Sequence, residues 1–331
     1  MRPALPVLLL LVAAAAAPRG ARGCGATCSD PRNLEGGKVV SANYCLVKYS
    51  ANCDYAEGSK KNIDCHPCDL LKYAQDECRT GQVAKGSDCN EGYVMMPDED
   101  CAKGSTPAAS KWKIVVTKAS RGVEDLLDGG GNNFNKYFAA LWRSSLPGSQ
   151  NPCKNQNFVQ TYLDKAPYTG MAINTVQYRS RHQFHAHIGM AKDQLHKGCV
   201  DVQIRAGAVT KARRWSDMKE CDFLSPLSGK TIRTQVWLRL EKVRDPATSV
   251  PKNVGTLITQ AAKLMRKAGM SDSAINDFTA VTVTGAKLNG ETYFAVLIFN
   301  IHKAWAADKD HLSSGSVGDH VMLVSSPPPK P

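Results

Sequence analysis

Residues 170–189 read Gly-Met-Ala-Ile-Asn-Thr-Val-Gln-Tyr-Arg-Ser-Arg-His-Gln-Phe-His-Ala-His-Ile-Gly and carry the clearest structural pattern of the chain. Its first part, Met171 to Thr175, is apolar and extended, whereas Gln183 to Ile188 alternates strictly between polar and apolar side chains. An alternation with a period of two predicts a β-strand that turns one face toward a core. The stretch therefore predicts two short strands joined by a basic loop.

The polar face of the second strand is the candidate site. This face carries Gln183, His185 and His187. The adjoining loop adds Arg179, Ser180 and Arg181. Imidazole can serve near neutral pH as a nucleophile, as a general acid or base, or as a metal ligand. Guanidinium groups, a hydroxyl and loop amides can neutralise and orient phosphate oxygens. The spacing alone leaves open phosphoryl chemistry, a zinc site, or packed polar residues.

Asn174, followed after ten residues by His185-x-His187, resembles the motif of the CDP-diacylglycerol pyrophosphatases, a branch of the histidine-triad superfamily. In that superfamily the middle histidine of His-φ-His-φ-His attacks the α-phosphate and forms a nucleotidyl-histidine. The resemblance implies that His185 is the nucleophile, that His187 assists the leaving phosphate, and that Gln183 takes the place of the first histidine. It also implies that Asn174, Ser180 and Gln183, together with Arg179 and Arg181 of the basic loop, bind phosphate.

The resemblance covers roughly residues 85 to 303 and is specific only between 170 and 189. Weaker blocks match in order at Cys89–Tyr93, Lys113–Lys118 and Asn132–Trp142, and at Arg214-Trp215 downstream. The family's cysteine after the last histidine is replaced by Met190, which puts the local disulfide pattern in question. The resemblance implies an α+β fold, with a histidine-triad-like antiparallel sheet and packed helices. It implies a nucleotide-diphosphate ester as substrate, with no metal and no cofactor.

Residues 1–23 predict a secretory signal peptide, with Arg2 before an apolar run and a small-residue cleavage site before Cys24. The run is short for a bilayer span, and an uncleaved anchor is the alternative. Removing the segment lowers the formal net charge from +12 to about +9. A basic protein suits an anionic partner such as a pyrophosphate or an acidic membrane surface. Neither a nucleic acid nor a specific protein partner is indicated.

Twelve cysteines behind a signal peptide predict disulfides and a secreted or lumenal protein. Nine of them precede residue 102: Cys24, Cys28, Cys45, Cys53, Cys65, Cys68, Cys78, Cys89 and Cys101. Residues 24–88 are poor in apolar runs and predict a small module held by disulfides. Cys65-His-Pro-Cys68 could also be a redox or zinc motif, but structural pairing is the preferred interpretation. We assign residues 89–305 to the histidine-triad-like domain and residues 306–331 to a polar, proline-rich tail.

Several further elements follow from periodicity and turn residues. Asn133 is expected to cap a helix over Phe134–Arg143, whose aromatic stripe is interpreted as core packing rather than as a wall for a base or acyl chain. The others are a strand over Thr234–Val243, a helix over Val254–Ala268 ended by Gly269, and a hairpin of Thr279–Thr284 with Tyr293–Asn300. His196 is expected to be an exposed surface imidazole.

Three functions remain open. The first is a hydrolase of phospholipid metabolism that cleaves CDP-diacylglycerol to CMP and phosphatidate, with His185 as nucleophile. The second is a hydrolase or transferase that acts on soluble nucleotides. The third is a non-catalytic, cysteine-rich extracellular binding protein whose histidines are inactive or hold zinc.

Overall fold

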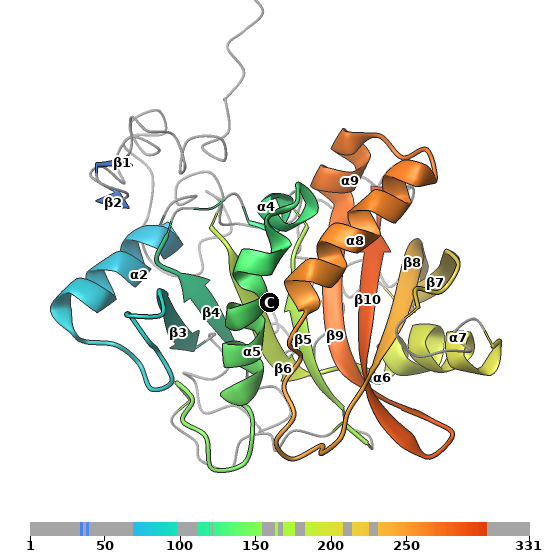
Figure 1. The fold of residues 1–331 in the computed structure, drawn as a ribbon, viewed down its shortest axis with the longest axis horizontal. Helices are drawn as coiled ribbons and strands as arrows, with labels where there is room; N and C mark the ends of the chain where they lie inside the picture. Colours follow the sequence, from blue (N-terminus) through green and yellow to red (C-terminus); the bar gives the residue numbers. More distant parts are fainter. Residues whose placement is uncertain are drawn as a thin grey trace, which may run out of the picture.

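The computed structural model describes residues 34–35, 38–39, 69–97, 111–118, 120, 122–153, 163–164, 168–175, 183–207, 214–224 and 231–302. They form an eight-stranded sheet in the order β3-β4-β6-β5-β9-β10-β8-β7, and every neighbouring pair is antiparallel (Figure 1). The strands are β3 (Tyr93–Pro97), β4 (Trp112–Val116), β5 (Thr169–Ile173), β6 (His185–Met190), β7 (Lys219–Leu224), β8 (Thr231–Lys242), β9 (Thr279–Leu288) and β10 (Glu291–Asn300). A separate two-stranded pair joins β1 (Leu34–Glu35) and β2 (Lys38–Val39). The predicted α+β class is confirmed.

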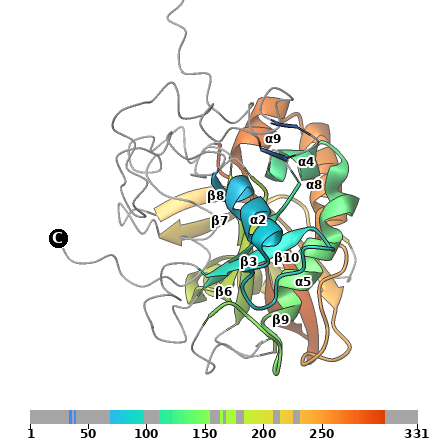
Figure 2. The same cartoon turned by 90° about the vertical axis from the view of Figure 1, so that its left-hand side faces the viewer.

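Three helices cover one face of the sheet: α4 (Val123–Leu127), α5 (Asn135–Arg143) and α8 (Val254–Lys267) (Figures 1 and 2). The 3-10 turn η6 (Gly130–Phe134) leads into α5. Alternate strand residues point into this layer, among them Ile114, Ala186 and Val283, and all three are buried. The period-two pattern read from the sequence therefore turns its apolar row toward the helices.

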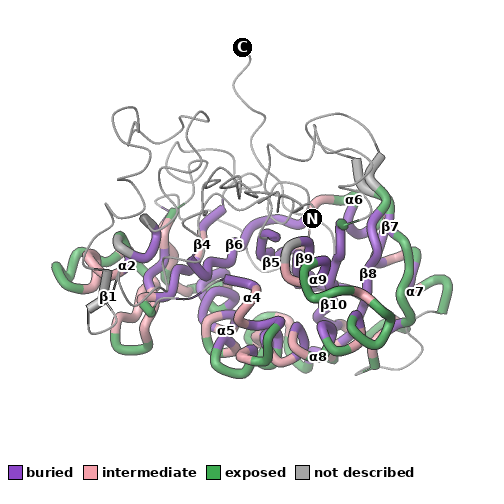
Figure 3. Tube along the Cα trace, turned by 90° about the horizontal axis from the view of Figure 1, so that it is seen from above, coloured by how far each residue is buried: buried purple, intermediate pink, exposed green. Residues whose placement is uncertain are grey.

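The opposite face of the sheet is covered at its two ends. Helix α2 (Asp69–Thr80) packs on β3 and β4, where Leu70 and Ala74 contact Val94 and Val115. At the other end, α6 (Asp193–Leu195), the π-helical turn η8 (His196–Val200) and α7 (Asp201–Arg205) lie beside β7. Figure 3 shows β5 and β6 buried along their whole length and α5 and α8 alternating between buried and exposed residues. The histidine strand β6 lies between these two covers.

Helix α2 falls within the predicted cysteine-rich module of residues 24–88, yet it packs on the sheet. Besides the apolar contacts, Gln75 Nε2 donates to the Thr117 carbonyl at 3.0 Å. A disulfide joins Cys78 in α2 to Cys89, with Cα atoms 5.6 Å apart. The described residues 69–88 of the module thus pack directly on the eight-stranded sheet.

A second disulfide joins Cys199 in η8 to Cys221 in β7, with Cα atoms 5.2 Å apart. Two cysteine pairs agree with the predicted disulfides and are compatible with an extracellular location. Among the described residues, no helix is long and apolar enough to cross a membrane. The predicted signal peptide, the Cys65–Cys68 motif and the tail over 306–331 lie outside the residues that the structure describes.

The predicted hairpin is confirmed. Strands β9 and β10 are joined at Asn289 and Gly290, whose φ angles of 52° and 78° both lie in the left-handed region. An Asn-Gly pair of this kind matches the twist of the flanking strands. The helix expected to end before Gly269 also ends there, and Gly269 has a φ of 84°.

The predicted cap at Asn133 is wrong. Asn133 lies inside η6, and α5 begins at Asn135 without a side-chain cap. Asn135 instead bonds to Thr256 in α8, since its Oδ1 accepts from the Thr256 amide at 3.2 Å and its Nδ2 donates to the Thr256 hydroxyl at 2.8 Å. The side chain that satisfies an orphan helix amide thus comes from a distant part of the chain.

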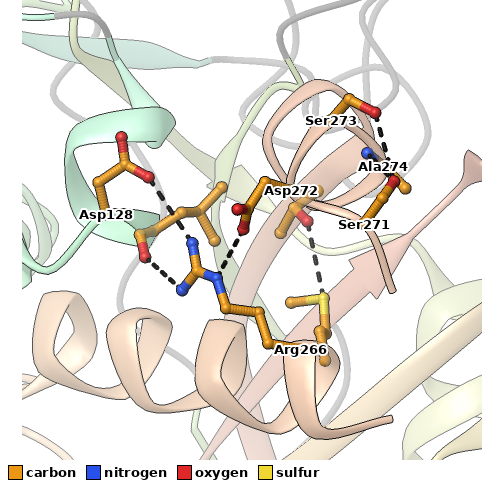
Figure 4. A network of polar contacts seen from close by, with 9 residues as sticks. Asp128, Arg266, Ser271, Asp272, Ser273 and Ala274 are labelled. Atoms are coloured by element: carbon orange, nitrogen blue, oxygen red, sulfur yellow. Dashed lines mark hydrogen bonds and ion pairs between the residues drawn. The ribbon is translucent and has the colours of Figure 1, made fainter. Parts of the chain in front are cut away.

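Figure 4 shows how α8 is joined to α4 and to α9 (Asp272–Phe278). Arg266 near the end of α8 donates from Nε to Asp272 at 2.7 Å and from Nη1 to the Leu127 carbonyl at 3.4 Å, and it lies 3.7 Å from Asp128. Ser271 caps α9 by accepting from the Ala274 amide. One guanidinium therefore fixes three elements on the helix side of the sheet.

Candidate functional site

His185 and His187 lie side by side on β6, on the sheet face opposite α4, α5 and α8. Their ring centroids are 5.2 Å apart and the rings meet edge to face, at 73°. The two residues are only 8% and 5% exposed. The two imidazoles predicted from the sequence are thus brought together in a site that is almost removed from water.

The apolar row of the same strand fixes the position of the histidines. Phe184 is fully buried and packs against Phe134 and Phe138, with ring centroids 4.7 and 5.7 Å away. This contact confirms that the aromatic stripe of α5 is core packing. Because successive side chains of a strand alternate, burying Phe184 and Ala186 under α5 turns His185 and His187 to the other face.

A hydrogen bond to a main-chain carbonyl indicates the tautomer of His185. Its Nδ1 lies 2.7 Å from the main-chain carbonyl oxygen of Gln183. A carbonyl can only accept, so Nδ1 carries the hydrogen, and the lone pair of the neutral ring is on Nε2. The arrangement prepares Nε2 to act as a nucleophile or as a base.

The side chain of Gln183 forms a structural clamp. Its Nε2 donates to the carbonyls of Val116 and Lys118 at 2.7 and 2.8 Å, and its Oε1 accepts from the Ser120 amide at 3.1 Å. The Ser120 hydroxyl in turn accepts from the Phe184 amide at 2.9 Å. Both amide hydrogens of Gln183, which is 1% exposed, are thus used by the backbone. In the structure this clamp takes the place of the phosphate contact expected from the sequence.

Lys113 and Asn174 belong to the chain segments on either side of β6. The β5–β6 register ends at the pair of Ala172 with His187, and Asn174, which is 6% exposed, directly follows the last residue of β5. On the other side of β6, the β4 register pairs Lys113 with His187. The sequence showed that Lys113 belongs to a strand, but not which strand it joins, so it was missed as a site residue.

Thr282 extends this polar row by one more strand. It lies opposite Ala172 on β9 and is fully buried. Its hydroxyl has no hydrogen-bond partner among the described residues. The predicted phosphate ligands Arg179, Ser180 and Arg181 lie outside the described residues, so their placement stays a prediction.

The expectation that His196 is an exposed imidazole is wrong. The residue is 4% exposed, and its ring stacks on Tyr168 with centroids 3.8 Å apart. Nε2 lies 3.1 Å from the Thr284 hydroxyl, which itself donates to the Thr169 carbonyl at 2.9 Å. Burial lowers the pKa of His196 to about 4, against an opposing effect of Asp193. The polar sequence around it hid the fact that Leu195, Cys199 and Val200 pack on the sheet and carry His196 with them.

A cavity of about 430 Å³ lies elsewhere, between β8, β10 and the start of α8. Its lining includes Arg244, Pro251, Leu257 and Phe294. Leu257 and Phe294 belong to the core on the helix side of the sheet, so the cavity is separated from His185 by the sheet itself. Within the described part of the chain, no three His, Cys, Asp or Glu residues are grouped so that they could hold a metal ion.

No family model and no curated protein matches the chain. The solved structure of a DUF4931 family protein from Bacillus cereus ATCC 10987 is similar to it with a TM-score of 0.32 and 11% sequence identity, over 66% of this chain and 88% of that one. A likeness this weak carries no argument about fold or function. The resemblance to the CDP-diacylglycerol pyrophosphatases therefore rests on the residues quoted from the sequence.

Proposed function

We propose that the protein hydrolyses the phosphoanhydride bond of a nucleotide-diphosphate ester through a covalent intermediate on His185. The observation that supports this most directly is the bond from His185 Nδ1 to the Gln183 carbonyl, because it leaves the lone pair on Nε2. CDP-diacylglycerol is the substrate that the sequence resemblance implies. The partner is therefore a lipid-linked nucleotide reached at an anionic membrane surface, in keeping with the basic net charge of +12.

In the proposed reaction, Nε2 of His185 forms a bond to the α-phosphorus while the bond from that phosphorus to the bridging oxygen breaks. The leaving phosphate takes the electron pair, and the neighbouring His187 hydrogen-bonds or protonates it. The Gln183 carbonyl stabilises the imidazolium as its charge develops. Water then attacks the same phosphorus, the P–N bond breaks, and CMP is released with the return of neutral His185.

Near-complete burial of the rings favours a second candidate, in which both histidines are packed polar residues of a non-catalytic protein. Buried imidazoles that only need a hydrogen bond are common in cores. The two candidates differ in one measurable respect, which is whether phosphorus becomes bound to His185. Activity on soluble CDP-alcohols instead of the lipid would identify the soluble-nucleotide alternative.

The test is trapping of the intermediate with CDP-diacylglycerol labelled at the α-phosphate. Rapid acid-free quenching of the wild-type protein should yield labelled protein, with and without a chelator, and His185→Ala should yield none. Lys263→Met, which removes an exposed charge from α8 on the other side of the sheet, is the control and should label like the wild type. Absence of label with both lipid and soluble substrates would reject the enzyme and favour the packed-histidine candidate.

A further inference from the structure

The histidine face carries a cation of its own, supplied by strand β4. Lys113 lies between Trp112 and Ile114, which are buried on the helix side, so its side chain belongs to the opposite face. It is partly exposed, and the β4–β6 register places it directly across from His187. Directly opposed residues of antiparallel strands have Cβ atoms about 5 Å apart, so these two side chains are nearest neighbours.

The polar residues of this face follow one another in order. His185 and His187 lie two positions apart on β6, Lys113 on β4 is paired with His187, and Asn174 directly follows β5. A nucleophile at His185 and a cation next to His187 therefore occupy opposite ends of the same row. This gives the site a direction, with one end for the attacked phosphate and the other for the phosphate that leaves.

We propose that Lys113 binds the second, departing phosphate of the substrate, so that the site is specific for diphosphate esters. This inference rests on the proposed function. As the bond to the bridging oxygen breaks, negative charge accumulates on the departing phosphate, and an ammonium group at that point stabilises it. The nearly buried surroundings of His185 and His187 strengthen this attraction, because little water competes for the charge.

The position of Lys113 also explains why His187 need not act alone. An imidazole gives one hydrogen bond toward a leaving oxygen, whereas a diphosphate ester releases a phosphate with further charged oxygens. An ammonium group has three donors and can meet these oxygens from the adjacent strand. The residues paired with Lys113 in the sheet are His187 on β6 and Met96 on β3.

The test compares two substrates that share the attacked phosphate and differ in what leaves. CDP-diacylglycerol releases a phosphate, whereas the p-nitrophenyl ester of CMP releases a phenolate that has no phosphate. Lys113→Met should lower kcat/KM for the first about 100-fold or more, in line with the loss of one charge-stabilising donor. It should leave the second nearly unchanged, which also shows that the variant is folded. Lys113→Arg should restore part of the lost activity on CDP-diacylglycerol.

Lys263→Met provides the matched loss of one positive charge and should affect neither substrate. Equal losses on both substrates, or no loss on CDP-diacylglycerol, would overturn the role of Lys113 while leaving the nucleotidyl-histidine intact. A wild-type protein that attacks neither substrate would overturn the proposed function and this inference together.

Discussion

The buried imidazole of His196 makes the folded protein sensitive to acid. Its pKa is lowered from 6.5 to about 4 by burial. In the unfolded chain the ring gains a proton near pH 6.5, whereas in the folded protein it stays neutral until about pH 4. The unfolded state therefore binds more protons in this window, and the free energy of unfolding falls as the pH decreases through it. The contribution of neutral His196 to the free energy of unfolding is fully present above pH 6.5 and is lost toward pH 4.

We expect His196→Gln to remove this part of the pH dependence. Glutamine keeps an N–H that can reach the Thr284 hydroxyl but does not titrate. Between pH 7.5 and pH 4.5, the wild-type protein should lose about 2.5 kcal/mol more unfolding free energy than the variant. Urea unfolding at the two pH values measures both losses. Equal losses would show that His196 is not the group that titrates.

Gln183 shows what a sequence can and cannot predict about a site. The period of two correctly placed His185 and His187 together, because strand alternation is a local property of the chain. The same pattern assigned Gln183 to the histidine row, but strand β6 begins at His185, and the Gln183 amide turns to Val116, Lys118 and Ser120 instead. These partners lie more than 60 residues away, and their positions depend on the fold as a whole.

Among the elements, η6 and α8 approach so closely that only glycine fits at their contact. A Cβ atom on Gly131 would lie 2.0 Å from the Gly255 carbonyl oxygen, and one on Gly255 would lie 2.1 Å from the Gly131 oxygen. Both neighbours are backbone atoms that no side-chain rotation can move aside. The Thr259 hydroxyl adds a bond from α8 to the Leu126 carbonyl at 2.6 Å. The contact thus depends on the backbones of the two elements.

Gly131→Ala should therefore destabilise the protein by about 3 kcal/mol, because a methyl group there forces the backbones apart. Gly148→Ala is the control. Gly148 has a φ of 76° but no atom within 4 Å of the added Cβ. Its substitution should therefore lower the free energy of unfolding by about 1 kcal/mol, because alanine is strained in a left-handed backbone conformation. Both values come from urea unfolding at neutral pH. A Gly131→Ala protein as stable as the Gly148→Ala protein would show that η6 can move away from α8.

The sequence predicted the elements whose ends are marked locally, and it missed those fixed by their partners. The β9–β10 turn at Asn289 and Gly290 and the end of α8 at Gly269 both depend on left-handed backbone, which glycine and asparagine signal directly. Helix α2 was missed because its sequence is mostly polar and lies in a cysteine-rich stretch. Its apolar residues Leu70 and Ala74 are buried only because the sheet packs against them, and the local sequence does not show this contact.

At the scale of the whole molecule, two separate parts of the described chain pack on the histidine face of the sheet. Helix α2 packs at the β3–β4 end, and Leu195, Cys199 and Val200 pack near the β7–β8 end. A disulfide bonds each cover to its surroundings, Cys78 to Cys89 and Cys199 to Cys221. His185 thus lies between two packed segments on the same face of the sheet. One of them, α2, belongs to the predicted cysteine-rich module, and the other belongs to the predicted histidine-triad-like domain.

This dependence can be tested by cutting the chain at the boundary predicted from the sequence. Two fragments are compared, residues 69–302 with Cys78→Ser and Cys89→Ser, and residues 89–302 with Cys89→Ser, so that neither contains the first disulfide. The shorter fragment lacks Leu70, Leu71 and Ala74, all 5% exposed or less, and exposes Val94 and Val115 on the sheet. Burying a leucine side chain contributes about 1.5–3 kcal/mol, so the loss of Leu70 and Leu71 removes about 3–6 kcal/mol, which is comparable to the whole stability of a marginal domain. We expect the longer fragment to unfold cooperatively in urea and the shorter one to aggregate or to show no cooperative transition. Equal stability of the two would mean that α2 is an independent part of the molecule and that the boundary at residue 88 is a true domain limit.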